Sequence, residues 1–299
     1  MTNVVIIGGG PGGYEAALVA AQLGGAVTLI ERRGLGGAAV LTDVVPSKTL
    51  IATAEVMTTM RGAHELGLRV GDLADLTDAF HVDLAAVNQR VLALAATQST
   101  DIEGRLRSEG VRLIDGVGKL YGTEHVVATT DEGEERLPAD IILVATGTTP
   151  RELPAARPDG ERILNWTQLY NLRALPERLI VVGSGVTGAE FASAYNALGA
   201  DVVLVSSRHQ VLPGEDDKAA RVVQQAFERS GMTIVSRSRA EAAEVVGDEV
   251  VVHLADGRTI TGSHCLMAVG SVPNTAEIGL TEAGVQLDDR GYVTVDKVS

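Results

Sequence analysis

The chain has 299 residues, of which 45% are hydrophobic and 21% charged, a globular composition with enough length for two domains. Its formal net charge of -14 repels phosphate backbones and acidic membranes, so we expect no nucleic-acid partner. The sequence has no apolar run that could span a bilayer and no signal peptide at its start, and a single cysteine excludes an intrachain disulfide, which together predict a cytoplasmic location.

The first predicted elements are a strand, a glycine-rich turn and a helix. Residues 4–7 form a short apolar run, the turn GGGPGG begins at Gly8, and residues 14–23 have the apolar pattern of a helix. Another strand is expected at residues 26–30. This order of elements is typical of the start of a Rossmann-type unit.

An insertion is expected between the start of this unit and its later strands. It contains VVPSKTL and a long helical pattern, for which Asp83 has the side chain of an N-cap and Gly110 is a stop signal. We place this helical insertion at about 46–110, within a first domain of residues 1–150. The apolar residues at helical spacing are Leu84, Val87, Val91, Leu94, Ile102 and Leu106.

The order of elements then repeats. A strand is expected at residues 180–182, the turn GSGVTG begins at Gly183, a helix follows at 189–198, and the next strand covers 202–205. Gly183 stands 175 positions after Gly8. The repeat predicts an α/β fold with two Rossmann-like FAD/NAD(P)-binding units, each with a parallel sheet and helices.

Short alternating strands follow in each unit, at residues 126–147 and 250–270. The Asp256-Gly257 dipeptide is typical of a hairpin turn in the second of these stretches. We therefore expect a small antiparallel β-meander in each unit. The predicted domains are 1–150, 151–275 and the returning segment 276–299.

Both glycine-rich turns lie between a strand and a helix, which is the context that a bound pyrophosphate needs. In the first turn Gly8 permits the tight bend, Gly10 lets the pyrophosphate approach, and Gly13 lets helix and strand pack closely. The helix start adds free amides and the positive end of a dipole. The corresponding glycines of the second turn are Gly183, Gly185 and Gly188.

The residues that end the following strands differ between the units. Glu31 lies about 20 residues after the first turn and suits a carboxylate that holds ribose hydroxyls, although it could also be a solvated loop charge. The second unit has Ser206, Ser207 and Arg208 there, without an acid. An arginine at this point admits a 2′-phosphate, so NADPH is expected beside NADH, while an ordinary surface cation is the alternative for Arg208.

Two such units, the first interrupted by PSK, resemble the flavoprotein disulfide reductase family, which includes lipoamide dehydrogenase and glutathione reductase. The matching pieces are GGGPGG, GLGGAAVLTDVVPSK, ATG ending at Gly147, GSGVTGAE, and GSVPNT starting at Gly270. The resemblance covers the whole chain. It implies that FAD binds to the first unit and NADH or NADPH to the second.

One departure from the family pattern bears on the chemistry. The family segment reads GGxCxxxxCxPSK, whereas Ala39 and Val44 occupy the two cysteine positions here. Their absence removes the redox disulfide beside the flavin, and with it the relay of a dihydrolipoyl dehydrogenase. The segment resembles the cysteine-lacking NAD(P)H quinone reductases of the family, which pass electrons from NAD(P)H to FAD and on to a quinone-type acceptor. A thioredoxin-reductase-like alternative requires a CxxC that the chain lacks.

Two charged residues acquire catalytic roles from the resemblance. Lys48 matches the lysine near flavin N5, and Glu190 matches its ion-pair partner by the nicotinamide pocket. A cation there stabilises the reduced, anionic flavin, and the pairing offsets the burial of both charges. The alternative is a surface lysine and a helix glutamate. Further cofactor contacts implied by position are Pro11, Gly12, Arg32, Gly37, Ala38, Ala39, Gly118, Ala145, Thr146 and Gly147 in the first unit, and Val186, Thr187, Ser206, Arg208 and Gly270 in the second.

The family continues beyond the equivalent of Ser299 with another FAD-contacting motif and an interface domain. We therefore expect a C-terminally truncated chain whose parent is a homodimer, and a non-catalytic nucleotide-binding fragment is the alternative function. The six histidines lack metal-site spacing. Cys265 is expected as a buried small residue in a strand, and Trp166 and Tyr170, spaced i, i+4, on one face of a helix.

Overall fold

The computed structural model describes residues 1–69 and 80–297 and divides into two compact units. Unit 1 comprises Met1–Val45, Ala93–Thr149 and Ser271–Ser299, and unit 2 comprises Pro46–Leu92 and Pro150–Gly270. The segment expected as an insertion in the first domain is thus shared between the units. Its two long helices are α3, Val44–Gly62, and α4, Leu84–Ser108.

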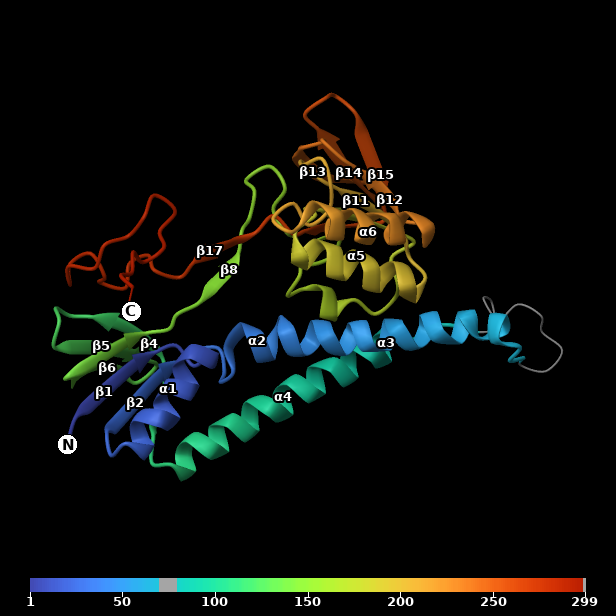
Figure 1. Cartoon of the computed structure of the whole chain (residues 1–299). Helices are drawn as coiled ribbons and strands as arrows, with labels where there is room; N and C mark the ends of the chain where they lie inside the picture. Colours follow the sequence, from blue (N-terminus) through green and yellow to red (C-terminus); the bar gives the residue numbers. More distant parts are fainter. Residues whose placement is uncertain (70–79, 298–299) are drawn as a thin grey trace. The chain divides into compact units, whose positions relative to one another are not determined.

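Unit 1 contains a parallel sheet with the strand order β3-β2-β1-β7 and an antiparallel meander with the order β4-β5-β6 (Figure 1). The expected strands and helix are all present. The elements are β1 (Asn3–Ile7), α1 (Pro11–Gln22), β2 (Ala26–Glu31), α2 (Gly37–Leu41), β3 (Arg112–Asp115), β4 (Val117–Leu120), β5 (His125–Thr130), β6 (Gly133–Pro138) and β7 (Ile141–Val144).

Strand β1 is buried on both faces, which explains why it reads as a continuous apolar run rather than an alternating one. Val4 and Ile6 pack with α1 and the end of α4, whereas Val5 and Ile7 pack with the meander. Side chains alternate between the two faces of a strand, so alternate residues of this apolar run belong to two different hydrophobic cores. The turn at Gly8 follows β1 at the carboxyl edge of this sheet, between β2 and β7.

Unit 2 repeats this plan with a parallel sheet in the order β12-β11-β10-β16-β9 and an antiparallel meander in the order β13-β14-β15. Ile180 and Val182 of its central strand pack with the meander, while Leu179 and Val181 face the helices. The elements are β9 (Ile163–Asn165), β10 (Arg178–Val182), α5 (Val186–Leu198), β11 (Asp201–Val205), α6 (Asp217–Arg229), β12 (Thr233–Val235), β13 (Ala240–Val246), β14 (Glu249–Leu254), β15 (Thr259–Gly262) and β16 (His264–Met267).

The chain changes unit within α3, within α4, and again at two short strands that pair with each other, β8 (Thr148–Pro150) and β17 (Ser271–Pro273) (Figure 1). Two 3-10 helices complete the described elements, η1 (Ala63–Leu66) and η2 (Leu169–Asn171). Among the described residues, no helix combines the length and apolar character that a membrane span needs.

Several local predictions are confirmed. The Asp83 side chain accepts a hydrogen bond from the Ala86 amide at 3.0 Å, so it caps the start of α4. Gly110 follows the end of that helix with a left-handed φ of 78°. The 256–257 pair lies in the hairpin between β14 and β15, with Gly257 at φ 84°. Cys265 is fully buried in β16, where burial raises the pKa of its thiol to about 12.

The expectation that Trp166 and Tyr170 share a helix face is wrong. Trp166 lies in a turn and Tyr170 in η2, although both are buried. The reason is local, because Asn165 Oδ1 accepts hydrogen bonds from the Thr167 amide at 3.0 Å and its hydroxyl at 2.7 Å. Such an Asx turn competes with a regular helix, and core packing then buries the two rings.

Candidate functional site

The first glycine-rich turn, from Gly8 to Gly13, accepts only glycine at two of its positions. Gly8 has a φ of +106°, and a Cβ there would collide with the carbonyl oxygen of Ala145. A Cβ on Gly13 would collide with the Gly8 carbonyl oxygen. The turn is therefore packed tightly against the end of β7 on one side and closes onto α1 on the other.

Gly10 is different, because its missing side chain leaves open space. It is the N-cap of α1, with φ -71° and ψ -178°, and no side chain caps the helix start. The nearest atom to a Cβ built on Gly10 is the Gly37 Cα, at 3.9 Å. Pro11 occupies the first helical position, where no amide hydrogen is needed. The helix start thus offers uncapped amides beside a gap, as a pyrophosphate requires.

Helix α2 lies against this turn and carries the predicted residues Gly37, Ala38 and Ala39. The Gly36 amide donates to the Gly9 carbonyl at 2.8 Å. Gly37 has a φ of +56°, and a Cβ on it would lie 2.7 Å from the Gly10 Cα. The structure therefore brings Gly37 onto the rim of the gap, where its backbone faces the backbone of Gly10.

Glu31 ends β2, as predicted, and its carboxylate contacts the glycine turn directly. Oε2 accepts a hydrogen bond from the Gly9 amide at 2.6 Å, and Oε1 accepts from the Arg32 and Arg33 amides at 2.8 and 2.7 Å. A Cβ on Gly9 would lie 3.0 Å from Glu31 Cγ. Glycine at position 9 and glutamate at position 31 thus fit each other, and the acid is held at the rim where a ribose is expected.

The segment ATG, residues 145–147, crosses the carboxyl edge of the sheet after β7. The Ala145 amide donates to the Ile7 carbonyl at 2.8 Å. Asn274 then fixes the segment from a distant part of the chain, because its Nδ2 donates to the Thr146 carbonyl and its amide to the Gly147 carbonyl, both at 2.9 Å. In the sequence, Asn274 stands out only as part of the GSVPNT segment. Gly118, on β4, lies against Ile7 and Ile30 under the same edge.

The second turn has the same geometry. Gly183 has a φ of +110° and fits against the Ala268 carbonyl, and a Cβ on Gly188 would collide with the Gly183 carbonyl. A Cβ on Gly185 would meet nothing within 4 Å. Gly185 is the N-cap of α5, again without a side-chain cap, and it is followed by Val186, which is 55% exposed, and Thr187. Gly270 has a φ of 95° and precedes β17.

In the second unit, the hydroxyl groups of Ser184 and Ser206 stand where the first unit has the Glu31 carboxylate. Ser206 stands 175 positions after Glu31, as Gly183 stands after Gly8. It is fully buried, and its Oγ shares a 2.7 Å hydrogen bond with Ser184 Oγ. The same hydroxyl accepts from the Arg208 amide at 3.1 Å. Ser206 therefore stabilises the strand end, and its hydroxyl faces the protein.

Lys48 and Glu190 form an ion pair within unit 2. Lys48 Nζ donates to both carboxylate oxygens of Glu190, at 2.6 and 2.7 Å. Lys48 lies in the first turns of α3, and Glu190 lies in α5 shortly after the glycine turn. The side chains are 53% and 31% exposed, so both charges are solvated in part. The structure thus contains the pairing that the sequence resemblance implied.

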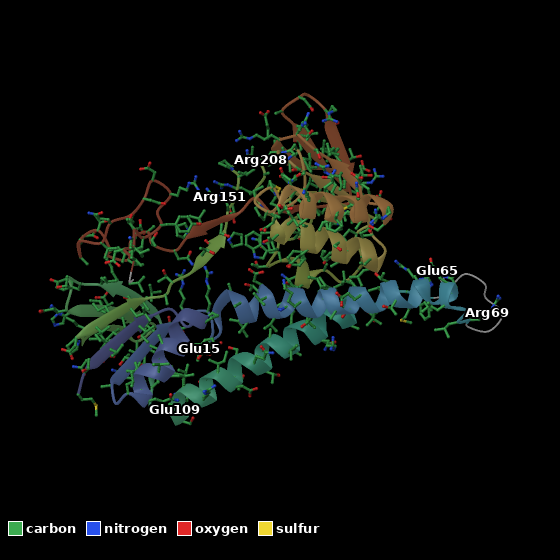
Figure 2. All side chains as sticks on the ribbon, viewed as in Figure 1. Glu15, Glu65, Arg69, Glu109, Arg151 and Arg208 are labelled. Carbon is green, nitrogen blue, oxygen red and sulfur yellow. The ribbon has the colours of Figure 1, made fainter. Side chains whose placement is uncertain are left out.

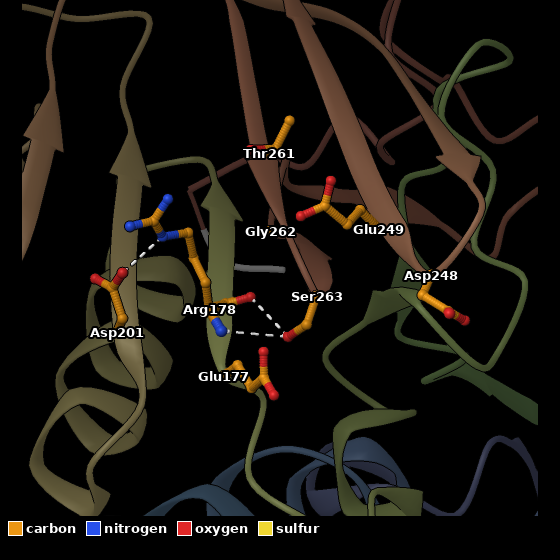
Figure 3. A pocket seen from close by; sticks show the side chains of 8 residues that line it. All are labelled: Glu177, Arg178, Asp201, Asp248, Glu249, Thr261, Gly262 and Ser263. Atoms are coloured by element: carbon orange, nitrogen blue, oxygen red, sulfur yellow. Dashed lines mark hydrogen bonds and ion pairs between the residues drawn. The ribbon is translucent and has the colours of Figure 1, made fainter.

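A separate polar cavity lies at the opposite, amino end of strands β10 and β11, with a volume of about 400 Å³ (Figure 3). Among the residues that line it, Arg178 Nε donates to Asp201 at 2.6 Å, and Ser263 Oγ accepts from the Arg178 amide at 3.2 Å. It is remote from the glycine turn, which follows the carboxyl end of β10. Within the part of the chain that the structure describes, no group of three metal-binding side chains is present.

Comparison with known proteins agrees with this geometry. The family described as pyridine nucleotide-disulphide oxidoreductase matches residues 2–299. The chain belongs to this family. Within the pyridine nucleotide-disulphide oxidoreductases, it is 49% identical to the NAD(P)H dehydrogenase (quinone) of Mycobacterium tuberculosis and 37% identical to the dihydrolipoyl dehydrogenase of Zymomonas mobilis. The alignments cover 100% and 98% of this chain and 62% of each relative, so the chain spans under two thirds of their length.

Solved structures of the pyridine nucleotide-disulphide oxidoreductases show the same architecture. The crystal structure of LpdA from Mycobacterium tuberculosis superposes with a TM-score of 0.92 at 48% identity, over 100% of this chain and 65% of that one. The flavoprotein disulfide reductase RclA from Escherichia coli matches with a TM-score of 0.83 at 24% identity, over 99% of this chain and 62% of that one, which supports the fold alone. The predicted fold class is therefore confirmed.

Proposed function

We propose that the protein is a flavin-dependent NAD(P)H oxidoreductase that passes electrons from NAD(P)H through FAD to a quinone-type acceptor without a redox disulfide. When bound, FAD takes two electrons from NAD(P)H and yields them to the acceptor. The observation that carries the proposal is the pair of uncapped helix starts, each with a central glycine, Gly10 or Gly185, whose side-chain space is open.

The residues present fit FAD on the first unit, taken as residues 1–150. The turn from Gly8 to Gly13 and the start of α1 would hold the pyrophosphate, and Glu31 at the sheet edge would hold ribose hydroxyls. Further contacts would come from Arg32, from Gly37, Ala38 and Ala39 on α2, from Gly118, and from the segment of Ala145, Thr146 and Gly147 that Asn274 fixes.

The second unit, taken as residues 151–275, would hold the nicotinamide dinucleotide in the same way. The Gly185 gap and the amides of Val186, Thr187 and Gly188 at the start of α5 would bind its pyrophosphate. Glu190 follows on the same helix and would hold Lys48 in position, and the ammonium would stabilise negative charge as it develops on the reduced ring.

The cysteine positions favour a quinone-type acceptor over a disulfide. Ala39, on α2, is half-buried and Val44, at the start of α3, is 49% exposed, and neither can exchange with a disulfide substrate. The chain's one cysteine, Cys265, is buried in β16 and cannot replace them. The name of the relative from Mycobacterium tuberculosis, NAD(P)H dehydrogenase (quinone), supports the same acceptor class.

A reductive titration tests the proposal. The purified chain, incubated with FAD and desalted, is expected to keep a flavin absorbance band that bleaches anaerobically with NADPH or NADH and returns on adding a soluble benzoquinone. Oxidised lipoamide in place of the quinone should not restore the band. Gly10→Ala, which fits the fold but fills the gap, should leave the protein colourless. A wild-type chain that binds FAD without being reduced would instead support a non-catalytic nucleotide-binding fragment.

A further inference from the structure

Helix α3 packs with α5 in unit 2 through one face, which ends at Arg61. Apolar side chains at a spacing of four and three residues place this face of α3 in a core that also contains the buried residues of α5. Arg61 continues the face in the last turn of α3. Figure 2 shows the side chains of both helices and labels Glu65, just beyond the end of α3. The apolar residues of this core are Leu50, Ala54 and Met57 on α3, and Phe191, Ala192, Ala194, Tyr195 and Leu198 on α5.

The Arg61 guanidinium binds the C-terminal end of α5. Its Nη1 donates to the Ala197 carbonyl at 2.9 Å, across 136 positions of the sequence. The Gly199 amide donates to the carbonyls of Tyr195 and Asn196, whereas the Ala197 carbonyl accepts from the arginine. The last carbonyls of a helix have no partner within the helix, and a cation there also complements the negative end of the helix dipole. The arginine and the helix end are therefore chemically matched.

Gly199 leaves the room that this guanidinium occupies. It is the C-cap of α5, with a φ of 116°, a left-handed conformation that favours glycine. A Cβ on Gly199 would lie 3.0 Å from Arg61 Nη2, closer than ordinary van der Waals contact. Arg61 Nε is buried in the same region. Glycine at position 199 thus serves both the end of the helix and the arginine beside it.

The hydrogen bond from Arg61 restricts a movement that the apolar face alone permits. Burial of apolar surface is non-directional, so an apolar contact tolerates small sliding and rotation of one helix against another. A hydrogen bond tolerates less, because it weakens steeply with angle and distance. Arg61 therefore fixes where the end of α3 lies on α5. The same helix carries Lys48, thirteen residues earlier.

We propose that Arg61 is a positioning residue for Lys48, because it holds α3 at the register in which the ammonium meets both carboxylate oxygens of Glu190. Those contacts are 2.6 and 2.7 Å long, so a displacement of α3 by about 1 Å would take them out of hydrogen-bond range. The inference deepens the proposed function and rests on it, because Lys48 influences the flavin only if FAD is bound and reduced. The sequence pattern gave Arg61 no role.

Acetylation of Lys48 measures the ion pair in the chain without cofactors. Limiting acetic anhydride and peptide mass spectrometry give the labelling of Lys48 relative to Lys218, an exposed lysine on α6. Arg61→Met keeps a long side chain but removes the donors, and it should raise this ratio by about three- to tenfold, toward the value in Glu190→Gln. Arg61→Lys can still donate to the helix end and should resemble the wild type. Arg221→Met, at an exposed position of α6, is the matched control.

Flavin reduction measures the consequence of the positioning. With FAD bound, Arg61→Met should slow anaerobic reduction by NADPH by about tenfold, and Arg61→Lys should restore the rate. NADP+ affinity should stay within about twofold of the wild type, because the start of α5 is unchanged. In the Lys48→Ala background Arg61→Met should add nothing, because its effect passes through the ammonium. A purely structural role would instead slow reduction alike in both backgrounds.

The outcomes separate this inference from the proposed function. If FAD on the wild-type chain is not reduced, the proposed function is wrong, and the role of Arg61 in reduction is wrong with it. If FAD is reduced, but Arg61→Met leaves Lys48 labelling unchanged or slows reduction equally without Lys48, Arg61 is not a positioning residue and the proposed function stands. If circular dichroism shows that Arg61→Met does not fold, Arg61→Gln, with a shorter donor, replaces it in both measurements.

Discussion

The Lys48 ammonium lies between the two carboxylate oxygens of Glu190, at 2.6 and 2.7 Å, although 142 positions separate the residues in the sequence. The pair joins α3 to α5 within unit 2. Both groups are partly solvated, and exposed ion pairs contribute at most ~1 kcal/mol to stability. Loss of the pair should therefore cost the fold little, so an effect of Lys48 on flavin reduction can be measured in a folded protein.

Lys48→Ala should slow reduction of bound FAD by NADPH by about 10- to 100-fold while FAD affinity changes little, because the variant removes charge stabilisation of the reduced ring. Anaerobic stopped-flow absorbance measures the reduction, and flavin fluorescence measures affinity. Lys48→Arg should recover part of the rate. Arg112→Ala breaks an exposed pair with Glu135 in unit 1 and serves as control. Unchanged reduction kinetics in Lys48→Ala would remove Lys48 from the mechanism.

Two alanine substitutions in one turn should have opposite effects. Gly185→Ala adds a methyl group to open space and should preserve stability while abolishing measurable dinucleotide binding. Gly188→Ala drives a methyl group into the Gly183 carbonyl and should lower the free energy of unfolding by ~1–3 kcal/mol. Thermal unfolding and NADP+ calorimetry on both variants make the comparison. Equal destabilisation would mean that the space beside Gly185 is not free.

The double substitution Ser184→Gly/Ser206→Glu should shift unit 2 toward NADH. It recreates the arrangement of Gly9 and Glu31, in which a glycine makes room for the acid and donates its amide to it. The introduced carboxylate should bind ribose hydroxyls and repel a 2′-phosphate, which raises the ratio of NADH to NADPH turnover by about tenfold or more. Ser206→Glu alone is the control, and it should destabilise the protein because Ser184 fills the space. An unchanged cofactor ratio in a folded double variant would contradict the comparison of the two edges.

Asn274→Leu should weaken FAD binding by releasing the Thr146 carbonyl from its side-chain donor. Loss of one such hydrogen bond costs about 1–3 kcal/mol. The effect should be confined to unit 1, so NADP+ affinity should not change. Thr275→Ala is a matched control, because that hydroxyl donates to Gly291 and not to the 145–147 segment. Fluorescence titration with FAD separates the variants, and equal affinities would exclude Asn274 as a positioning residue.

The local part of the fold was readable from the sequence because its signals are contiguous. A buried strand, a glycine turn and a helix start occupy about 20 consecutive residues in each unit, and glycines such as Gly13 are required by backbone contacts within that stretch. The family and the fold class that this pattern predicted are confirmed. The cofactor roles of the individual residues remain predictions.

What the sequence concealed depends on contacts between distant residues. Asn274 reaches Thr146 across 128 positions, and Arg61 reaches the Ala197 carbonyl across 136. No periodic pattern in the sequence predicts such contacts between distant residues. The error at Trp166 and Tyr170 has the converse origin, because i, i+4 spacing of two buried rings also arises from a turn followed by a short 3-10 helix.

Because Cys265 is buried in β16, its chemical labelling can report how often the unit 2 sheet opens to solvent. Alkylating reagents attack the thiolate, and a thiol with a pKa of about 12 is almost entirely protonated near neutral pH. The chain has no other cysteine, so any mass gained from such a reagent reports exposure of β16 alone. The rate of labelling under native conditions would therefore record how often the sheet of unit 2 opens to solvent, without any introduced probe.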